Sequence, residues 1–332
     1  MYDGTLLIIS NFISLAILRY LKISSITNSR ESFNNIGKAV RLSPESVRYR
    51  INNYIKQDII KYFLATINAI KLGYSYYDIY IKLQNVDEKK KQEMISYFMN
   101  NSYVAWMANV EGAYDIAMII IVKNQLELQD WVEQFNQKFS AMVMKKTIAI
   151  NLRGEFLQRD YLINNPRNEK KATSEYSTTE DLEKLDDIDM NICRALSINS
   201  RINCVELGKK LNISSDTILL RIKNLRKKDV ITGFSIVLNN DKFPQMHYKI
   251  LLYLNNNSEE KIKMLLSLLR MNPRVIAIIK TLAEWDYEID AEVENIAQFK
   301  EIIMSITNTY SDVVRDYIIL RIVDMPKYNF FP

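Results

Sequence analysis

The spacing of apolar residues divides the chain into helix-like and strand-like stretches. Apolar residues recur three and four apart in 188–196, around 205–211 and in 218–225. This spacing predicts three short helices, each with one buried face. In 231–238 the period changes to two, which predicts a hairpin-like wing. Three short helices and a wing form a winged helix-turn-helix.

The same pattern occurs twice in the chain. Residues 36–71 align without a gap with residues 207–242, an offset of 171 positions. The aligned identities are Gly37/Gly208, Lys38/Lys209, Ser43/Ser214, Arg50/Arg221, Ile51/Ile222, Asn53/Asn224, Asp58/Asp229, Ile60/Ile231 and Phe63/Phe234. A repeat of this length indicates two copies of one domain-sized unit.

The rest of each copy alternates between strand and helix patterns. The first copy predicts strands at 77–83, 103–110, 114–122 and 143–152, with helices at 88–99 and 126–139. The second copy predicts strands at 248–254, 274–281, 285–293 and 314–323, with helices at 259–270 and 296–310. The order β-α-β-β-α-β is typical of a four-stranded antiparallel sheet with two helices on one face.

One strand in this arrangement indicates a further partner. Residues 116–122 are apolar at every position, so we expect both faces of this strand to be buried. Helices cover one face, and the second copy is the obvious cover for the other. The equivalent strand of the second copy alternates Glu288, Asp290 and Glu292 with apolar residues, and the pattern does not say where these acids point.

The bulk composition is that of an ordinary globular protein. Of 332 residues, 48% are hydrophobic and 25% charged, with a net charge of +5. The two cysteines, Cys193 and Cys204, are expected to be free thiols in a reducing compartment. The apolar run 6–18 carries polar residues, which predicts a buried first helix. We therefore expect a cytoplasmic protein without membrane association.

The segments that carry a family likeness are LDDIDMNICRAL (185–196), ISSDTILLRIKNLRKKDVITGF (213–234), LSPESVRYRINNYIKQDIIKYF (42–63) and GAYD (112–115). In these segments the chain resembles the Lrp/AsnC family of transcription regulators. The resemblance implies an N-terminal helix-turn-helix, a C-terminal effector-binding sheet domain, and dimerisation through the sheets. The chain departs from the family at Asp58 and Asp229, where glycine is usual, and at Ala283 in the second sheet loop.

The expected fold class is therefore α+β, with two winged helix-turn-helix domains and two ferredoxin-like (βαββαβ) antiparallel-sheet domains in tandem. The expected boundaries are 1–70 for the first winged helix-turn-helix, 74–160 for the first sheet domain, 161–183 for a polar linker, 184–241 for the second winged helix-turn-helix and 245–326 for the second sheet domain.

Double-stranded DNA is the expected partner. The candidate DNA-binding residues are Ser43, Pro44, Glu45, Arg48, Tyr49, Asn52, Ser214, Ser215, Thr217, Arg221, Lys223, Arg226 and Lys227. Arginine suits guanine and asparagine suits adenine, whereas lysine clamps phosphate. For Arg50 and Arg221 a structural ion pair is as consistent with the pattern as a phosphate contact.

The two recognition helices differ where they should read bases. Arg48 and Tyr49 of the first copy align with Leu219 and Leu220 of the second. We expect the first helix to supply most of the sequence discrimination.

The family resemblance also implies a small effector, such as an amino acid, and self-association through the sheet domains. The candidate effector-binding residues are Gly112, Tyr114, Asp115, Trp285 and Asp286.

The expected function is a sequence-specific DNA-binding transcription regulator in which each chain imitates the family's dimer. We expect no catalytic residue, metal or cofactor, and hence no enzyme. The single histidine, His247, has no second histidine for a metal site or triad, so a structural role is expected.

Two alternatives remain open. Tandem proteins of this architecture include sirohaem decarboxylases, for which His247, Arg153, Arg159 and Arg274 are the available residues. The other alternative is an interaction protein that has lost DNA binding, against which the basic run 221–228 argues.

Overall fold

The computed structural model describes residues 17–18, 20–21, 29–163, 172–178, 181–239, 242, 245–255 and 258–331. The chain forms two compact units, and each unit takes segments from both repeats. The head unit comprises Met1–Asn68, Gln158–Pro166 and Lys184–Pro244, and the sheet unit comprises Ala69–Leu157, Arg167–Glu183 and Gln245–Pro332. The fold is α+β, as expected.

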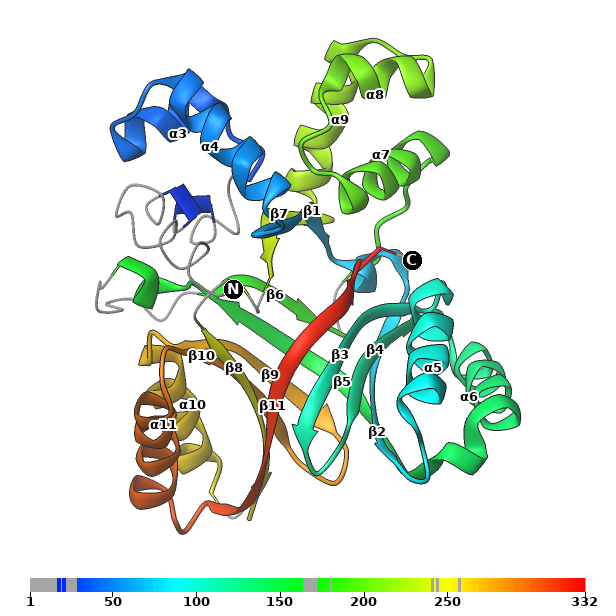
Figure 1. Cartoon of the computed structure of the whole chain (residues 1–332), viewed down its shortest axis with the longest axis vertical. Helices are drawn as coiled ribbons and strands as arrows, with labels where there is room; N and C mark the ends of the chain where they lie inside the picture. Colours follow the sequence, from blue (N-terminus) through cyan, green and yellow to red (C-terminus); the bar gives the residue numbers. More distant parts are fainter. Residues whose placement is uncertain are drawn as a thin grey trace. The chain divides into compact units, whose positions relative to one another are not determined.

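The head unit contains the short helices of both repeats (Figure 1). These are α3 (Phe33–Val40) and α4 (Pro44–Lys56), then α7 (Asp187–Ile198), α8 (Cys204–Leu211) and α9 (Ser215–Lys227). The hydroxyl oxygen of Ser43 accepts a hydrogen bond from Ser46 N and caps α4, and Ser214 caps α9 through Thr217 N in the same way. Most of the run 6–18 lies outside the described residues, but Ile17 and Leu18 are buried.

The predicted hairpin-like wing is wrong, because its strand pairs with a different partner. Strand β7 (Ile231–Leu238) forms no local hairpin; it pairs antiparallel with β1 (Ile60–Ile67) of the first repeat. The two strands have equivalent positions in the repeat, and Leu64 faces its counterpart Ser235 at the centre of the ribbon. A period of two predicts a strand but not its partner, because both arrangements bury the same face.

Reciprocal hydrogen bonds relate the two repeats in the head unit by a local two-fold axis. The Arg30 guanidinium donates to the Ser200 carbonyl at 2.7 Å, and its counterpart Arg201 donates to the Ser29 carbonyl at 2.6 Å. The hydroxyls of Ser29 and Ser200 meet at 3.1 Å and are buried. These bonds and the ribbon join the short helices of both repeats in one folded body.

The sheet unit contains the predicted β-α-β-β-α-β order in both repeats. In the first repeat these elements are β2 (Ser75–Leu83), α5 (Glu88–Asn100), β3 (Val104–Gly112), β4 (Ile116–Val122), α6 (Gln125–Phe139) and β5 (Val143–Leu157). In the second they are β8 (Met246–Leu254), α10 (Glu259–Met271), β9 (Val275–Leu282), β10 (Tyr287–Val293), α11 (Ile296–Thr309) and β11 (Val314–Tyr328). Short 3-10 turns lie at Ala69–Leu72, Ser140–Met142 and, in the head unit, Asp160–Ile163.

The strands of both repeats form one nine-stranded sheet in the order β2-β4-β3-β11-β8-β10-β9-β5-β6. An additional pairing of β2 with β5 closes this sheet on itself. Each repeat continues into the other at two equivalent junctions, β3 with β11 and β9 with β5. The closure leaves an interior between the repeats and an outer face on each.

Strand β6 (Ala172–Ser177) lies within the stretch expected as a linker. It pairs with the far end of β5, and its Tyr176 is buried. The Tyr176 ring lies against Gly154, where an added Cβ would meet ring carbon at 2.3 Å. Polar composition predicted exposure here, but the strand pairs with β5 and Tyr176 packs on Gly154.

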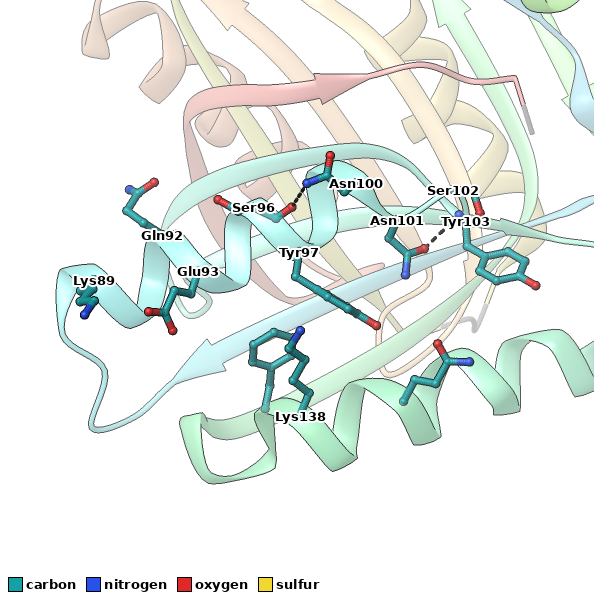
Figure 2. A pocket seen from close by; sticks show the side chains of 12 residues that line it. Lys89, Gln92, Glu93, Ser96, Tyr97, Asn100, Asn101, Ser102, Tyr103 and Lys138 are labelled. Atoms are coloured by element: carbon teal, nitrogen blue, oxygen red, sulfur yellow. Dashed lines mark hydrogen bonds between the residues drawn. The ribbon is translucent and has the colours of Figure 1, made fainter.

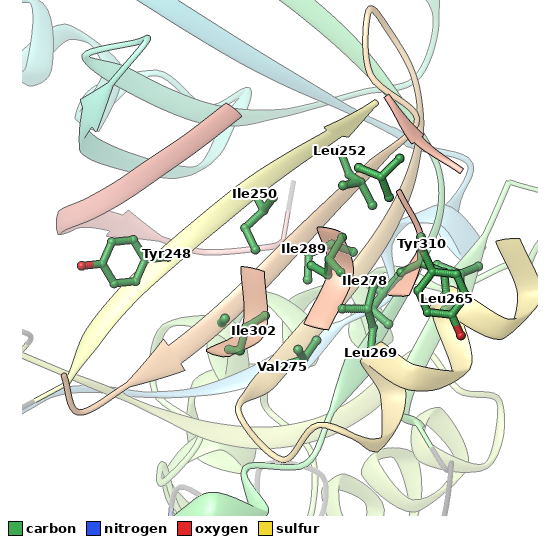
Figure 3. Packing of buried hydrophobic residues seen from close by; sticks show 14 of the residues in the cluster. Tyr248, Ile250, Leu252, Leu265, Leu269, Val275, Ile278, Ile289, Ile302 and Tyr310 are labelled. Carbon is green, nitrogen blue, oxygen red and sulfur yellow. The ribbon is translucent and has the colours of Figure 1, made fainter. Parts of the chain in front are cut away.

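Helices cover the outer faces of the sheet. In the second repeat, Ile250 and Ile289 of the strands pack with Leu265, Leu269 and Ile302 of α10 and α11 (Figure 3). Residues Met118 and Ile120 of β4 pack in the corresponding outer core of the first repeat.

The interior between the repeats has an apolar part. Ala117 of β4 packs there with Leu251, Trp285 and Leu320 of the second repeat. The expectation that β4 is buried on both faces, with the second copy as its cover, is therefore confirmed. None of the helices in the described ranges has the length and apolar content needed to span a membrane.

Candidate nucleic-acid interface and ligand sites

Helix α4 exposes a row of polar side chains. Glu45, Arg48, Tyr49 and Asn52 lie three and four positions apart and are all exposed, with Tyr49 at 68%. The opposite face buries Val47, Ile51 and Tyr54 in the predicted stripe. Of the expected residues before and at the helix start, Ser43 is exposed and Pro44 is half-buried.

Helix α9 exposes an apolar pair at the equivalent positions. Leu219 is 60% exposed and Leu220 58% exposed, with Lys223 exposed one turn further on. Ile218, Ile222 and Leu225 form the buried stripe. Ser214 is exposed, whereas Ser215 and Thr217 are half-buried.

The cations at the end of α9 remain exposed. Arg226 and Lys227 both lie in the last turn of the helix and face solvent. The Arg226 guanidinium also lies 5.8 Å from the centre of the Phe234 ring.

Arg221 is engaged in a structural ion pair. Its guanidinium contacts the Asp186 carboxylate at 2.7 Å and the Asp189 carboxylate at 2.9 Å. The hydrogen bonds that the guanidinium donates to Asp186 and Asp189 raise the pKa of Arg221 above its usual value. Asp186 also caps α7, so Arg221 joins α9 to α7, and the ion-pair alternative is favoured here over a phosphate contact.

Two of the expected effector residues bind backbone. Asp115 accepts from Leu83 N at 2.7 Å, and its counterpart Asp286 accepts from Leu254 N at 2.8 Å. Asp115 also pairs with Lys82 at 2.9 Å. Both carboxylates thus fasten the β3–β4 and β9–β10 loops to the adjacent strands.

Of the other expected effector residues, two are buried and the third lies close to the backbone of a neighbouring strand. Tyr114 and Trp285 are buried. The Tyr114 hydroxyl lies 3.0 Å from Thr147 Oγ1, and Trp285 Nε1 donates to Glu288 at 3.0 Å. Gly112 is exposed with φ of 132°, and an added Cβ would lie 2.6 Å from a backbone carbonyl oxygen of β11.

A surface groove of about 960 Å³ lies between α5 and α6 (Figure 2). The residues that line it are Lys89, Gln92, Glu93, Ser96, Tyr97, Asn100, Asn101, Ser102, Tyr103, Gln134, Lys138 and Phe139. Most of the lining residues have polar side chains, and Lys138 Nζ lies 4.5 Å from the centre of the Tyr97 ring. The five residues expected to bind an effector are not among those lining this groove.

A buried polar network fills part of the interior between the repeats, and the sequence did not predict it. Lys249 Nζ donates to Glu288 at 3.0 Å and to Asp290 at 2.9 Å. The Tyr80 hydroxyl of the first repeat donates to Glu288 at 2.6 Å, and His247 Nε2 lies 3.0 Å from Asp290. The acids of the alternating strand β10 therefore point inward. The matching alternation of Lys249 with apolar residues in β8 was the available signal.

The electrostatics of this network follow from its burial. Burial opposes the ionisation of Asp290, but Lys249 and His247 outweigh it and lower the Asp290 pKa to about 2. Burial alone would lower the pKa of Lys249, but the carboxylates of Asp290 and Glu288 raise it above its usual value. The expected structural role of His247 is consistent with its contact to Asp290.

Asp78 and Asn151 lie beside this network with unsatisfied atoms. Burial, reinforced by the charge of Glu288, raises the pKa of Asp78 well above its usual value. Asn151 is 1% exposed, and neither amide atom makes a hydrogen bond of normal geometry. Across the described ranges, no three His, Cys, Asp or Glu residues form a group suited to a metal ion.

The residues available to a tetrapyrrole enzyme belong to both units. Arg153 pairs with Glu175 at 3.0 Å in the sheet unit, where His247 and Arg274 also lie. Arg159 belongs to the head unit. His247 Nε2 lies 3.0 Å from Asp290 Oδ1 in the interior between the repeats.

The comparisons with known sequences agree on one protein family. The AsnC-type helix-turn-helix domain matches residues 185–226. The leucine-responsive regulatory protein of Rhizobium meliloti is 30% identical over 144 residues, which is 42% of this chain and 90% of that protein. The HTH-type transcriptional regulator Ptr1 of Methanocaldococcus jannaschii is 31% identical over 119 residues, 35% of this chain and 78% of that protein.

The full length of the chain matches a solved structure of a different kind. The crystal structure of the siroheme decarboxylase NirDL superposes with a TM-score of 0.61 and 14% identity, covering 96% of this chain and 93% of that one. The expectation that the chain is no enzyme is corrected by this match. An enzyme has the same full-length fold, so missing catalytic motifs do not exclude catalysis.

Proposed function

Because the chain belongs to the Lrp/AsnC family of transcription regulators, we propose that it is a sequence-specific double-stranded DNA-binding regulator whose two repeats act as a pseudo-dimer. The observation that carries the proposal is the pair of capped helices α4 and α9, joined in one unit about a local two-fold axis. Paired recognition helices suit two half-sites on one duplex.

The proposed roles follow from side-chain chemistry. Arg48 and Asn52 read guanine and adenine from the major groove, and Tyr49 contacts phosphate. On the second helix Lys223, Arg226 and Lys227 bind the backbone. Exposed cations suit that role, because phosphate contacts fix position and affinity without requiring a particular base.

We assign the parts of the chain in the same terms. Residues 1–70 and 184–241 are the helix-turn-helix domains, although β1 and β7 pair with each other instead of forming separate wings. Residues 74–160 and 245–326 are two ferredoxin-like domains in tandem. Their strands follow the order β5-β2-β4-β3 and β11-β8-β10-β9, which is the same arrangement in each repeat.

In this proposal a small effector, such as an amino acid, acts through the sheet unit. The expected residues Asp115 and Asp286 then act by holding loops, since their carboxylates already bind backbone amides. Self-association of whole chains also belongs to the proposal.

A salt titration tests DNA binding. The affinity for a duplex carrying a selected site should fall with rising salt, with a log–log slope of about −0.9 for each phosphate neutralised. Lys227→Ala should make the slope shallower by about one, whereas Lys300→Ala, which removes an exposed lysine of the sheet unit, should leave it unchanged. Absence of binding at low salt, or a slope near zero, contradicts the proposal.

Tetrapyrrole decarboxylation is the second candidate function, favoured by the full-length match to NirDL. A related structure holds that enzyme with an iron-uroporphyrin III analogue. Titration of this chain with iron-uroporphyrin III tests it through the Soret band. A saturable spectral shift supports a tetrapyrrole site, and an unchanged spectrum at high protein concentration removes it.

A further inference from the structure

We infer that the chain recognises an asymmetric DNA site, in which α4 reads a half-site by hydrogen bonds and α9 reads thymine methyl groups through Leu219 and Leu220. This inference rests on the proposed function and extends it to the chemistry of the target. Its basis is the contrast between two helices that occupy equivalent places in one folded unit.

The two helices begin in the same way. Both have 13 residues, and their capping residues Ser43 and Ser214 have φ of −68° and −67° with ψ of 151° in each. The turns before them are also equivalent, because Gly37 and Gly208 each approach a backbone carbonyl oxygen so closely that an added Cβ would lie 2.5–2.6 Å from it. The two helices therefore present equivalent positions to a ligand.

Those equivalent positions carry different chemistry. Arg48, Tyr49 and Asn52 correspond to Leu219, Leu220 and Lys223. The leucines belong to the outer face, because the inner face of α9 is already filled by Ile218, Ile222 and Leu225. A leucine side chain has no donor or acceptor, and the thymine methyl is the apolar group that the major groove offers.

The charge around the leucines favours DNA over a protein partner. Exposed Lys223 and Lys227 lie on the same helix, and exposed Lys209 lies on the preceding helix α8. Cations one and two turns beyond a small apolar pair match phosphates that follow a base edge along the groove. A hydrophobic protein interface, by contrast, has few lysines at its core.

Because a local two-fold axis relates the two helices, the difference between α4 and α9 should appear as a difference between the two halves of the DNA site. With both helices held by the ribbon and by the Arg30 and Arg201 contacts, one chain should contact two half-sites at a fixed separation. Identical heads would select a palindrome. These heads should select one half-site rich in guanine and adenine contacts and another that contains thymines.

Selection from a random duplex pool with the full-length chain is the first test. The expected result is a site with unequal halves. A palindrome with equal information in both halves overturns this inference but leaves the proposed function standing. Failure to enrich any sequence overturns the proposed function and the inference with it.

Replacing thymine by uracil in the second half-site is the sharper test, since it removes only the methyl group. Each contacted methyl should be worth about four-fold in affinity, from the burial of one carbon group. The Leu219→Ala/Leu220→Ala double variant should bind the thymine and uracil duplexes equally. Equal binding of both duplexes by the unaltered chain overturns the inference.

An exchange of residues completes the experiment. Leu219→Arg with Leu220→Tyr should shift the selected site toward a palindrome, and Arg48→Leu with Tyr49→Leu should remove guanine from the first half. The positions are exposed, so thermal melting should change little, and it serves as the check on folding. A folded exchange variant that selects the original site overturns the assignment.

Discussion

At the scale of single residues, two aspartates occupy a backbone conformation that favours glycine. Asp58 and Asp229 follow the recognition helices with φ of 55°, a left-handed conformation that costs ordinary L-residues roughly 1–2 kcal/mol and aspartate less. Glycine, the residue that the family resemblance implies at both positions, adopts this conformation without such a cost. Asp58 offsets part of the cost, because its carboxylate accepts from Asn239 Nδ2 at 2.7 Å.

Replacing the two aspartates by glycine should change the stability of the fold unequally. Asp229→Gly should raise the free energy of unfolding by about 0.5–1 kcal/mol, because it relieves the left-handed strain. Asp58→Gly should gain less or lose stability, since it also removes the bond to Asn239. Chemical denaturation followed by far-UV circular dichroism measures both variants. Equal gains in both would show that the Asn239 contact contributes nothing.

At the scale of elements, the sequence pattern of strand β10 predicted the strand but not the location of its acidic face. The alternation of acids with apolar residues predicts a strand with two unlike faces, and β10 has them. The polar face is buried instead of exposed, because Lys249 of β8 and Tyr80 of β2 come from distant parts of the chain and satisfy it. Only strand order brings these groups together.

The network predicts an acid-sensitive sheet unit. The Asp290 pKa is about 2 in the folded chain against an ordinary 3.8. Since the folded state binds this proton less readily than the unfolded state, Asp290 stabilises the fold above pH 3.8, and the stabilisation of about 2 kcal/mol disappears as the pH falls toward 2.

Asp290→Asn provides the control for this prediction. Unfolding by urea at pH 5 and at pH 3 should show a smaller loss of stability on acidification in the variant than in the unaltered chain. The variant should also be less stable at pH 5, because Lys249 loses one of its two carboxylate partners. Identical pH dependence of the two proteins would contradict the assigned pKa.

Sequence pattern identified most of the elements and part of the candidate interface. Helical stripes such as Ile218–Ile222–Leu225 and the caps Ser43 and Ser214 are local, so they were predictable. The partner of β7 was not predictable, because this pairing joins residues 164 to 178 positions apart in the sequence. Arg221 likewise could be assigned to Asp186 only after α7 and α9 had been placed against each other.

At the scale of the whole molecule, tryptophan fluorescence reports on one of the two units alone. All three tryptophans, Trp106, Trp131 and Trp285, belong to the sheet unit. Arg201 belongs to the head unit, where it is half-buried and donates to carbonyls of the other repeat.

Arg201→Ala should therefore weaken the head unit selectively. Its thermal transition by circular dichroism, to which the helices of both units contribute, should shift or broaden toward lower temperature, whereas the tryptophan fluorescence transition should stay in place. The loss of buried carbonyl partners is the physical reason. A matching shift of both signals would mean that the units unfold as one cooperative body.

The covalent connection between the repeats has a further consequence for mass action. In a dimer of separate subunits, dilution removes the partner, and occupancy of a two-headed site then depends on the square of the concentration. Here Ser29 and Ser200, which meet at the local two-fold axis, belong to one chain. Dilution therefore does not separate the two repeats. Occupancy should follow the first power of protein concentration, and no related subunit can exchange into the pair. One helix is then free to change its residues while the other keeps its own, an independence that identical subunits encoded by one sequence never have.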